Sequence, residues 1–149
     1  MKTTTEKAIV AYRILNNAKI SKMKDGDKFN IVKIMKELKP IATGYDDFLK
    51  DATKKLEPEG VEEIQKKINP AFSLPPEQQR NEIVKLLSAD ELAVWDKFNS
   101  DVAKCVDEEV SKEIKFKFKP LSEEGFKGLI GSNDFAMSEI MALYDVIGE

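Results

Sequence analysis

The chain has 149 residues and a mass of 16.9 kDa, so we expect a single domain over residues 1–149 that can bury a sizeable core without staples. With 42% hydrophobic and 34% charged residues and a net charge of −3, the composition is typical of a globular protein with a strongly ionic surface. It argues against collagen-like, low-complexity and fully disordered classes.

The first half of the chain predicts two helices. Apolar residues recur at helical spacing over residues 5–17, behind a threonine that can cap the helix. After the turn at 25–26, a second apolar stripe begins at 27 and keeps a repeat close to 3.5 residues as far as 56. Pro40 interrupts this stripe without shifting its phase. We therefore expect one long helix over 27–56, kinked at Pro40, rather than two helices.

The middle of the chain predicts three further helices between prolines. Residues 61–68 form a short one, and 69–77 form a proline-rich loop whose Phe72 and Leu74 are expected to anchor it to the core. Pro76 opens the next helix. The sequence SADE at 88–91 is a capping box that begins another helix, which carries Trp95 on its inner face.

Residues 113–119, EIKFKFK, give the clearest strand signature, because apolar residues alternate there with lysines. The candidate partners of this strand are the segment 71–74, the segment 19–23 and the same strand of a second subunit. Two short helices follow, one capped at Ser122 and one that ends near 147. The fold class expected is therefore mainly α: a helical bundle with a long, Pro-kinked helix and one short β element.

The residue types exclude much chemistry. The chain has no histidine, the commonest general base and metal ligand. The single Cys105 can form neither an internal disulfide nor the usual zinc sites, and we interpret it as a buried structural thiol. We therefore expect no enzyme activity, no catalytic residues, no cofactor and no metal ion. Asp47 and Asp51 share a helix face and leave a metal or acid–base site as a weaker alternative.

Basic residues concentrate at the N-terminus. Residues 1–39 contain ten lysines or arginines and four acids, a net charge of +6, whereas the rest of the chain carries −9. Such a surface suits phosphate backbones, but the scarcity of arginine and of interleaved aromatics favours a solvated surface or one docked on the acidic remainder. If nucleic acid binds here, the candidate contacts are Lys19, Lys22, Lys24, Lys28, Lys33 and Lys36.

The apolar stripe and the strand without a clear partner indicate a protein that binds another protein or a second copy of itself, so we expect a homo-oligomer. The candidate interface residues are Ile31, Met35, Leu38, Tyr45, Ile114, Phe116 and Phe118. No run approaches the roughly 20 apolar residues of a membrane span, and no secretory signal is evident. The expected location is cytoplasmic, without membrane partners.

Taken together, these features resemble an uncharacterised group of small helical proteins encoded by tailed bacteriophages and prophages. The resemblance rests on the segment AYRILNNAKISKMKDGDKFNIVKIMKELKPIATGYDDFLKDATKKL, followed by an acidic helical middle and a short strand before the C-terminal helices. It implies a phage or mobile-element origin and a non-enzymatic role in virion or tail assembly, either in the bacterial host or in the virion. The group offers no catalytic residues to carry over to this chain.

Overall fold

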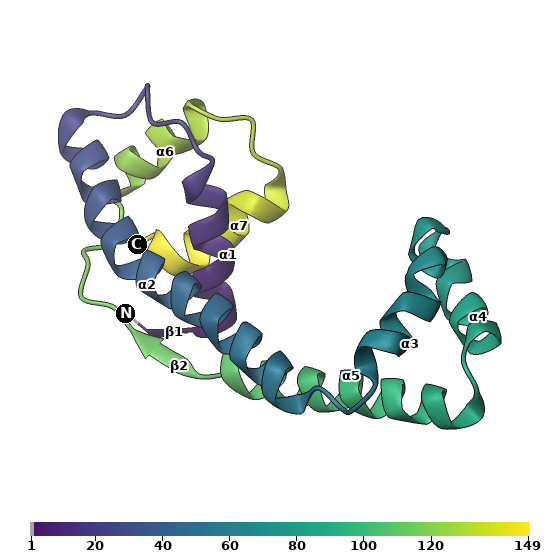
Figure 1. Ribbon diagram of the computed structural model, residues 1–149. Coiled ribbons are helices and arrows are strands. Elements are labelled where there is room, and N and C mark those ends of the chain that lie inside the picture. Colours follow the sequence, from purple (N-terminus) through teal and green to yellow (C-terminus); the bar gives the residue numbers. More distant parts are fainter. Residues whose placement is uncertain (1) are drawn as a thin grey trace. The chain divides into compact units, whose positions relative to one another are not determined.

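The computed structural model describes residues 2–149 (Figure 1). In chain order its elements are β1 (Lys2–Thr4), α1 (Thr5–Asn16), α2 (Asp25–Leu56), α3 (Val61–Ile68), the 3-10 helix η1 (Asn69–Ser73), α4 (Pro76–Leu86), α5 (Ala89–Val110), β2 (Glu113–Lys115), α6 (Glu123–Gly131) and α7 (Met137–Ile147). The predicted fold class, mainly α with one small β element, is confirmed.

The chain divides into two compact units. Unit 1 contains the residues up to Phe48 together with Glu108–Glu149, and unit 2 is the continuous segment Leu49–Asp107. Both boundaries fall inside helices, one in α2 and one in α5. The single domain expected over residues 1–149 stays a prediction, because this division describes compactness and not independent folding.

The long helix α2 is continuous through Pro40, as predicted. It begins at Asp25, two residues before the expected cap, and the kink expected at Pro40 stays a prediction. The preceding helix α1 also agrees with the sequence, because the side chain of Thr4 accepts a hydrogen bond from the backbone N–H of Lys7 at its first turn.

The strand partners expected from the sequence were wrong. β2 pairs antiparallel with β1 at the N-terminus, with Thr3 opposite Ile114. Within residues 2–149, the paired part of the predicted strand 113–119 is Glu113–Lys115, which lies opposite Lys2–Thr4. The following residues bond to side chains of α2 instead: the Lys117 N–H donates to Glu37 Oε2 at 2.8 Å, and Asn30 donates to the Lys119 carbonyl at 3.2 Å.

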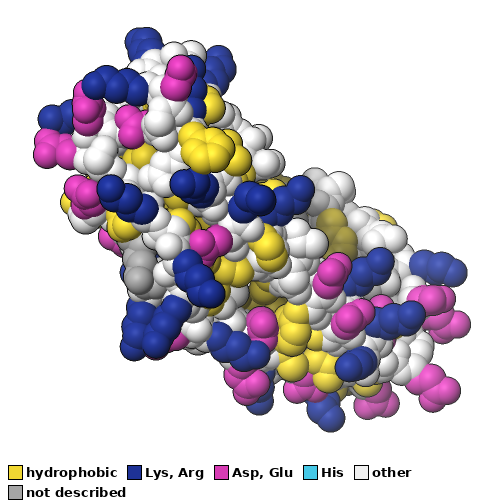
Figure 2. All heavy atoms as spheres, turned by 90° about the vertical axis from the view of Figure 1, so that its left-hand side faces the viewer, with side chains coloured by type: hydrophobic (Ala, Val, Ile, Leu, Met, Phe, Trp, Pro, Cys, Tyr) yellow, Lys and Arg dark blue, Asp and Glu magenta, His cyan; other side chains and the backbone are white. Residues whose placement is uncertain are grey.

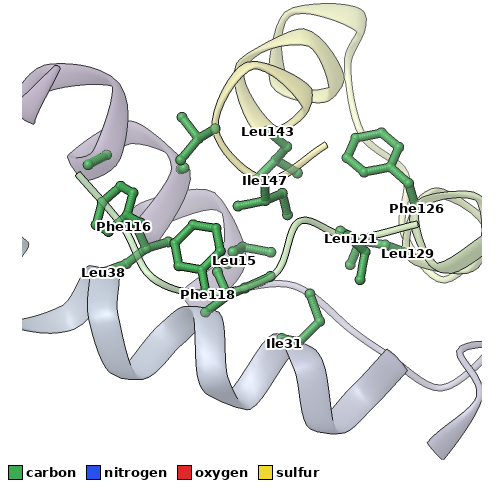
Figure 3. Close-up of a cluster of buried hydrophobic side chains, with 14 of the residues drawn as sticks. Leu15, Ile31, Leu38, Phe116, Phe118, Leu121, Phe126, Leu129, Leu143 and Ile147 are labelled. Atoms are coloured by element: carbon green, nitrogen blue, oxygen red, sulfur yellow. The ribbon is translucent and has the colours of Figure 1, made fainter. Parts of the chain in front are cut away.

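The core of unit 1 lies between α1, α2, α6, α7 and the segment that follows β2. In Figure 3, Leu38 of α2 and Leu143 of α7 enter the cluster from different helices, and Phe116 and Phe118 belong to it, with ring centroids 4.9 Å apart. The buried members of the cluster are Ala8, Ala11, Leu15, Met23, Ile31, Ile34, Leu38, Phe116, Phe118, Leu121, Phe126, Leu129, Leu143, Val146 and Ile147.

The connection between α1 and α2 is fastened to the end of α6. Asn133 accepts a hydrogen bond from the Lys19 N–H and donates to the Lys19 carbonyl, both at 2.7 Å, while Ser132 Oγ accepts from the Lys22 N–H at 2.9 Å. A Cβ at Gly128 would lie 3.3 Å from the Met23 backbone, so this glycine allows α6 and the connection to approach closely. The backbone of the lysine-rich turn is therefore fixed.

Unit 2 has a smaller core, formed by Ile64, Ile68, Ala71, Ile83 and Leu87, with Leu86, Leu92 and Trp95 packed against it. The predicted capping box of α5 is confirmed, because the Ser88 and Glu91 side chains each accept a hydrogen bond from the other residue's N–H, at 3.2 and 3.1 Å. The expected core anchor Phe72 was wrong, since it is 52% exposed. Residues 69–73 form a 3-10 helix instead of an irregular loop, and its turn directs Ala71 into the core.

Candidate interaction surfaces

The predicted interface residues lie largely inside unit 1. Four of them are 7% exposed or less and belong to its core: Ile31, Leu38, Phe116 and Phe118. Met35 and Ile114 are partly buried against the same core, and Tyr45 is half-buried. The apolar stripe of α2 and the apolar side of the predicted strand therefore pack against the chain's own helices. Because β2 also has its partner within the chain, the strand no longer argues for a second subunit.

The six lysines of the nucleic-acid alternative lie on two segments, and one of them is paired within the chain. Lys19 and Lys22 lie on the connection fixed to α6, and Lys24 forms an ion pair with Glu124. The hydrogen bond and charge of Glu124 raise the pKa of Lys24, and Lys24 correspondingly lowers the pKa of Glu124. The remaining three lie on α2: Lys28 is half-buried, and Lys33 and Lys36 are exposed.

The outer side of α2 carries a mixed apolar and basic surface, which we call the α2 patch: Phe29, Val32, Lys33 and Lys36. Their spacing places them on one side of the helix, and Phe29 and Val32 are 60% and 49% exposed. The Lys33 ammonium lies 4.9 Å from the centroid of the Phe29 ring, a cation–π contact. Figure 2 shows the left-hand side of the molecule in Figure 1, where α2 begins, and exposed hydrophobic side chains lie there among both basic and acidic ones.

The outer side of α7 carries a second apolar surface, which we call the α7 strip: Met137, Met141 and Tyr144. These side chains are 70%, 61% and 52% exposed and recur at i, i+4 and i+7. The sequence shows this spacing, because residues 137–147 include apolar residues on two sides of a helix.

The α7 strip continues into a pocket between α6 and α7 with a volume of about 330 Å³. The Tyr144 ring lies edge-on to Phe126, with centroids 5.4 Å apart, and its hydroxyl donates to the Glu149 carbonyl at 2.7 Å. The pocket is lined by Leu121, Glu123, Phe126, Lys127, Tyr144 and Glu149. A strip of two methionines and a tyrosine beside an apolar pocket suits adaptable contacts with another protein.

The surroundings of the α7 strip are acidic. Residues 121–149 contain six carboxylates and one lysine, but Glu124 and Asp145 are paired with Lys24 and Lys7 of other segments, so the charge around the strip is less negative than this composition alone indicates. That lysine, Lys127, lies 2.7 Å from Glu123 and lowers the pKa of its carboxyl by a hydrogen bond and by its charge. The strip and its rim therefore combine apolar contact area with negative charge, which favours a partner that is apolar and basic.

Unit 2 carries a shallower hollow of about 450 Å³ lined by Glu62, Gln65, Lys66, Asn69, Phe72 and Trp95. Trp95 was expected in the core and is only partly buried there, with one side against the core of unit 2. Cys105 was expected to be buried and is half-buried instead.

Within residues 2–149, no group of three or more His, Cys, Asp or Glu side chains is placed to hold a metal ion. None of the helices in this part of the chain has the length and hydropathy of a membrane span.

Comparison of the chain with protein-family models, with curated proteins and with solved structures finds no match.

Proposed function

We propose that this chain is a non-enzymatic interaction or assembly protein whose binding surface is the α7 strip. The observation that carries the proposal is the exposure of Met137, Met141 and Tyr144 beside the pocket at Phe126. Isolated exposed apolar residues are ordinary on proteins, but a continuous row leading into an apolar pocket is typical of a binding site. A role in virion or tail assembly stays a prediction, which rests on the sequence resemblance alone.

The chemistry of the surface specifies the kind of partner. The apolar row requires aliphatic or aromatic anchors, and the carboxylates around it favour lysine or arginine on either side of them. A basic amphipathic helix meets both conditions, because it presents its anchors at the same i, i+3, i+4 and i+7 spacing as the strip.

Selection of random peptides on the immobilised chain tests this proposal. We expect enriched peptides that combine apolar anchors with basic residues. Their affinity should fall at least tenfold in the double variant Met137→Gln/Met141→Gln, and should fall with rising salt. The matched control is Val84→Gln, which replaces a 46% exposed residue of unit 2 and should bind as the unchanged chain does. Binding that survives the double variant would contradict the proposal.

A nucleic-acid-binding accessory protein is the second candidate. It is favoured by the exposed Phe29 beside Lys33, because an aromatic ring next to lysines suits base stacking with phosphate contact. It predicts binding to single or double strands at low salt that disappears in Lys33→Glu/Lys36→Glu. The intramolecular pairing of Lys24 with Glu124 weakens this candidate.

A further inference from the structure

We propose that the occupant of the α7 strip is the α2 patch of a second copy, so that copies associate head to tail. This inference rests on the proposed function and names its partner. In the contact, Phe29 of one copy enters the pocket beside Tyr144 of the next copy, and Val32 packs against the exposed methionines.

The two surfaces are complementary in apolar contact, because the α2 patch has an exposed aromatic side chain and the α7 strip has an apolar pocket. Phe29 is 60% exposed, more than Phe72 or Tyr144 at 52% each, and it lies on the solvent side of α2. The pocket of about 330 Å³ has Leu121 and Phe126 in its lining, and its size suits one aromatic side chain. A rigid aromatic anchor in an apolar pocket is the usual centre of a protein interface.

The charges of the two surfaces are also complementary. Lys33 and Lys36 accompany Phe29 on the α2 patch, whereas the carboxylates of Glu123 and Glu149 line the pocket. Lys127 also lines the pocket, but it is already paired with Glu123. Opposite charges at the rim steer two copies together and disfavour the contact of either surface with its own counterpart.

The geometry decides the form of the assembly. In Figure 3, α2 and α7 lie on opposite sides of the buried cluster, so the α2 patch and the α7 strip, which are on the outer sides of these helices, face away from each other. A second copy cannot cover two surfaces that face away from each other, so the contact is heterologous, and one patch and one strip stay unused at the ends of the assembly. Such an assembly grows as a chain or closes as a ring, rather than stopping at a two-fold dimer.

The contact is expected to be weak, because it centres on five apolar side chains and its charged rim is screened by salt. We expect a dissociation constant on the order of 100 µM at low salt.

Light scattering over a concentration series up to about 1 mM tests the proposal, since that range brackets the expected constant. The unchanged chain should grow in mean mass beyond a dimer, and high salt should reduce that growth. Phe29→Gln and the double variant Met137→Gln/Met141→Gln should each stay at the mass of one chain. An equimolar mixture of these two variants should stop at twice that mass, because it retains one intact patch and one intact strip. The control Val84→Gln should grow as the unchanged chain does.

Several outcomes would overturn the inference. If the chain stays monomeric at the highest concentration but its strip still binds the selected peptides, the partner of the strip is not a second copy. The proposed function is then unaffected. A dimer that never grows further, or a mixture of the two variants that stays monomeric, would exclude the head-to-tail contact. If the mean mass grows only after a DNA duplex is added, the α2 patch binds nucleic acid and not the α7 strip. Loss of both peptide binding and self-association would remove the proposed function as well.

Discussion

The two units of this chain are built in different ways. Within residues 2–149, unit 1 joins the N-terminal and C-terminal parts of the chain around a core cluster of fifteen residues, whereas unit 2 is one continuous segment around a cluster of five. Of the largest fully buried side chains, only Ile68 lies in unit 2. Unit 2 also contains the surface ion pairs Arg80–Asp96 and Lys67–Glu91. Such pairs contribute little to stability. We therefore expect unit 1 to contribute most of the free energy of unfolding and unit 2 to unfold first.

The largest expected effect is that of Leu38→Ala in unit 1. Leu38 is 0% exposed, so truncation leaves a cavity and lowers the free energy of unfolding by about 3 kcal/mol. Urea denaturation followed by circular dichroism measures the change. Val32→Ala on the same helix is the control; its side chain is 49% exposed, and it should cost less than about 0.5 kcal/mol. Equal effects of the two variants would contradict the assigned core.

The corresponding substitution in unit 2 is Ile68→Ala, which should cost about 2 kcal/mol because the smaller core collapses more readily around the lost side chain. Hydrogen exchange separates the units: amides of 61–87 should lose protection, while those of α1 and α7 keep theirs. A uniform loss over the whole chain would show that both units unfold together.

Gly60→Ala tests the backbone of unit 2. Gly60 has a φ of 80° before α3, in the left-handed region, so alanine should cost about 1 kcal/mol. The control is Gly44→Ala inside α2, where an added Cβ meets nothing within 4 Å. That change should stabilise the chain by about 0.5–1 kcal/mol. Thermal denaturation should show a lower melting temperature for Gly60→Ala and a higher one for Gly44→Ala.

Thr3→Val should strengthen unit 1. The Thr3 hydroxyl is buried and has no hydrogen-bond partner within residues 2–149, so its removal should stabilise the fold by about 1 kcal/mol. Thr5→Val is the matched control: the Thr5 hydroxyl donates to the Lys112 carbonyl at 3.2 Å, and its loss should cost about 1 kcal/mol. If both variants shift the free energy of unfolding in the same direction, the different hydrogen bonding of the Thr3 and Thr5 hydroxyls is contradicted.

The smallest effect expected is that of pH. Ion pairs lower the pKa of Glu91 and Asp96 in unit 2 and of Glu123 and Glu124 in unit 1, with a hydrogen bond from the basic partner as the largest cause in each case. The unfolded chain therefore takes up protons first, and this stabilisation is present above the ordinary values of 4.5 and 3.8 and is lost as pH falls below them. The chain has no histidine, so the melting temperature should not show a histidine step between pH 6 and 8.

Local signals predicted the helices well. The threonine before α1, the apolar repeat of α2 and the capping box at Ser88 act within a few residues, and each gave the right element. The strand failed differently: its own alternation was visible, but its partner Lys2–Thr4 is too short to show any pattern. Phe72 failed because the 3-10 turn, rather than the size of the side chain, decides which residue points inward.

The candidate surfaces follow the same division. Helical spacing correctly grouped Ile31 and Leu38, and it also grouped Met137, Met141 and Tyr144, but spacing alone does not say which group is covered. By itself the sequence determined which segments are helical and that imidazole chemistry is absent. Only the tertiary structure decided which apolar side of each helix is buried and which strand pairs with β2, because those choices depend on contacts such as Thr3 with Ile114 and Lys19 with Asn133. Residues so far apart in the chain leave no local pattern that records their contact.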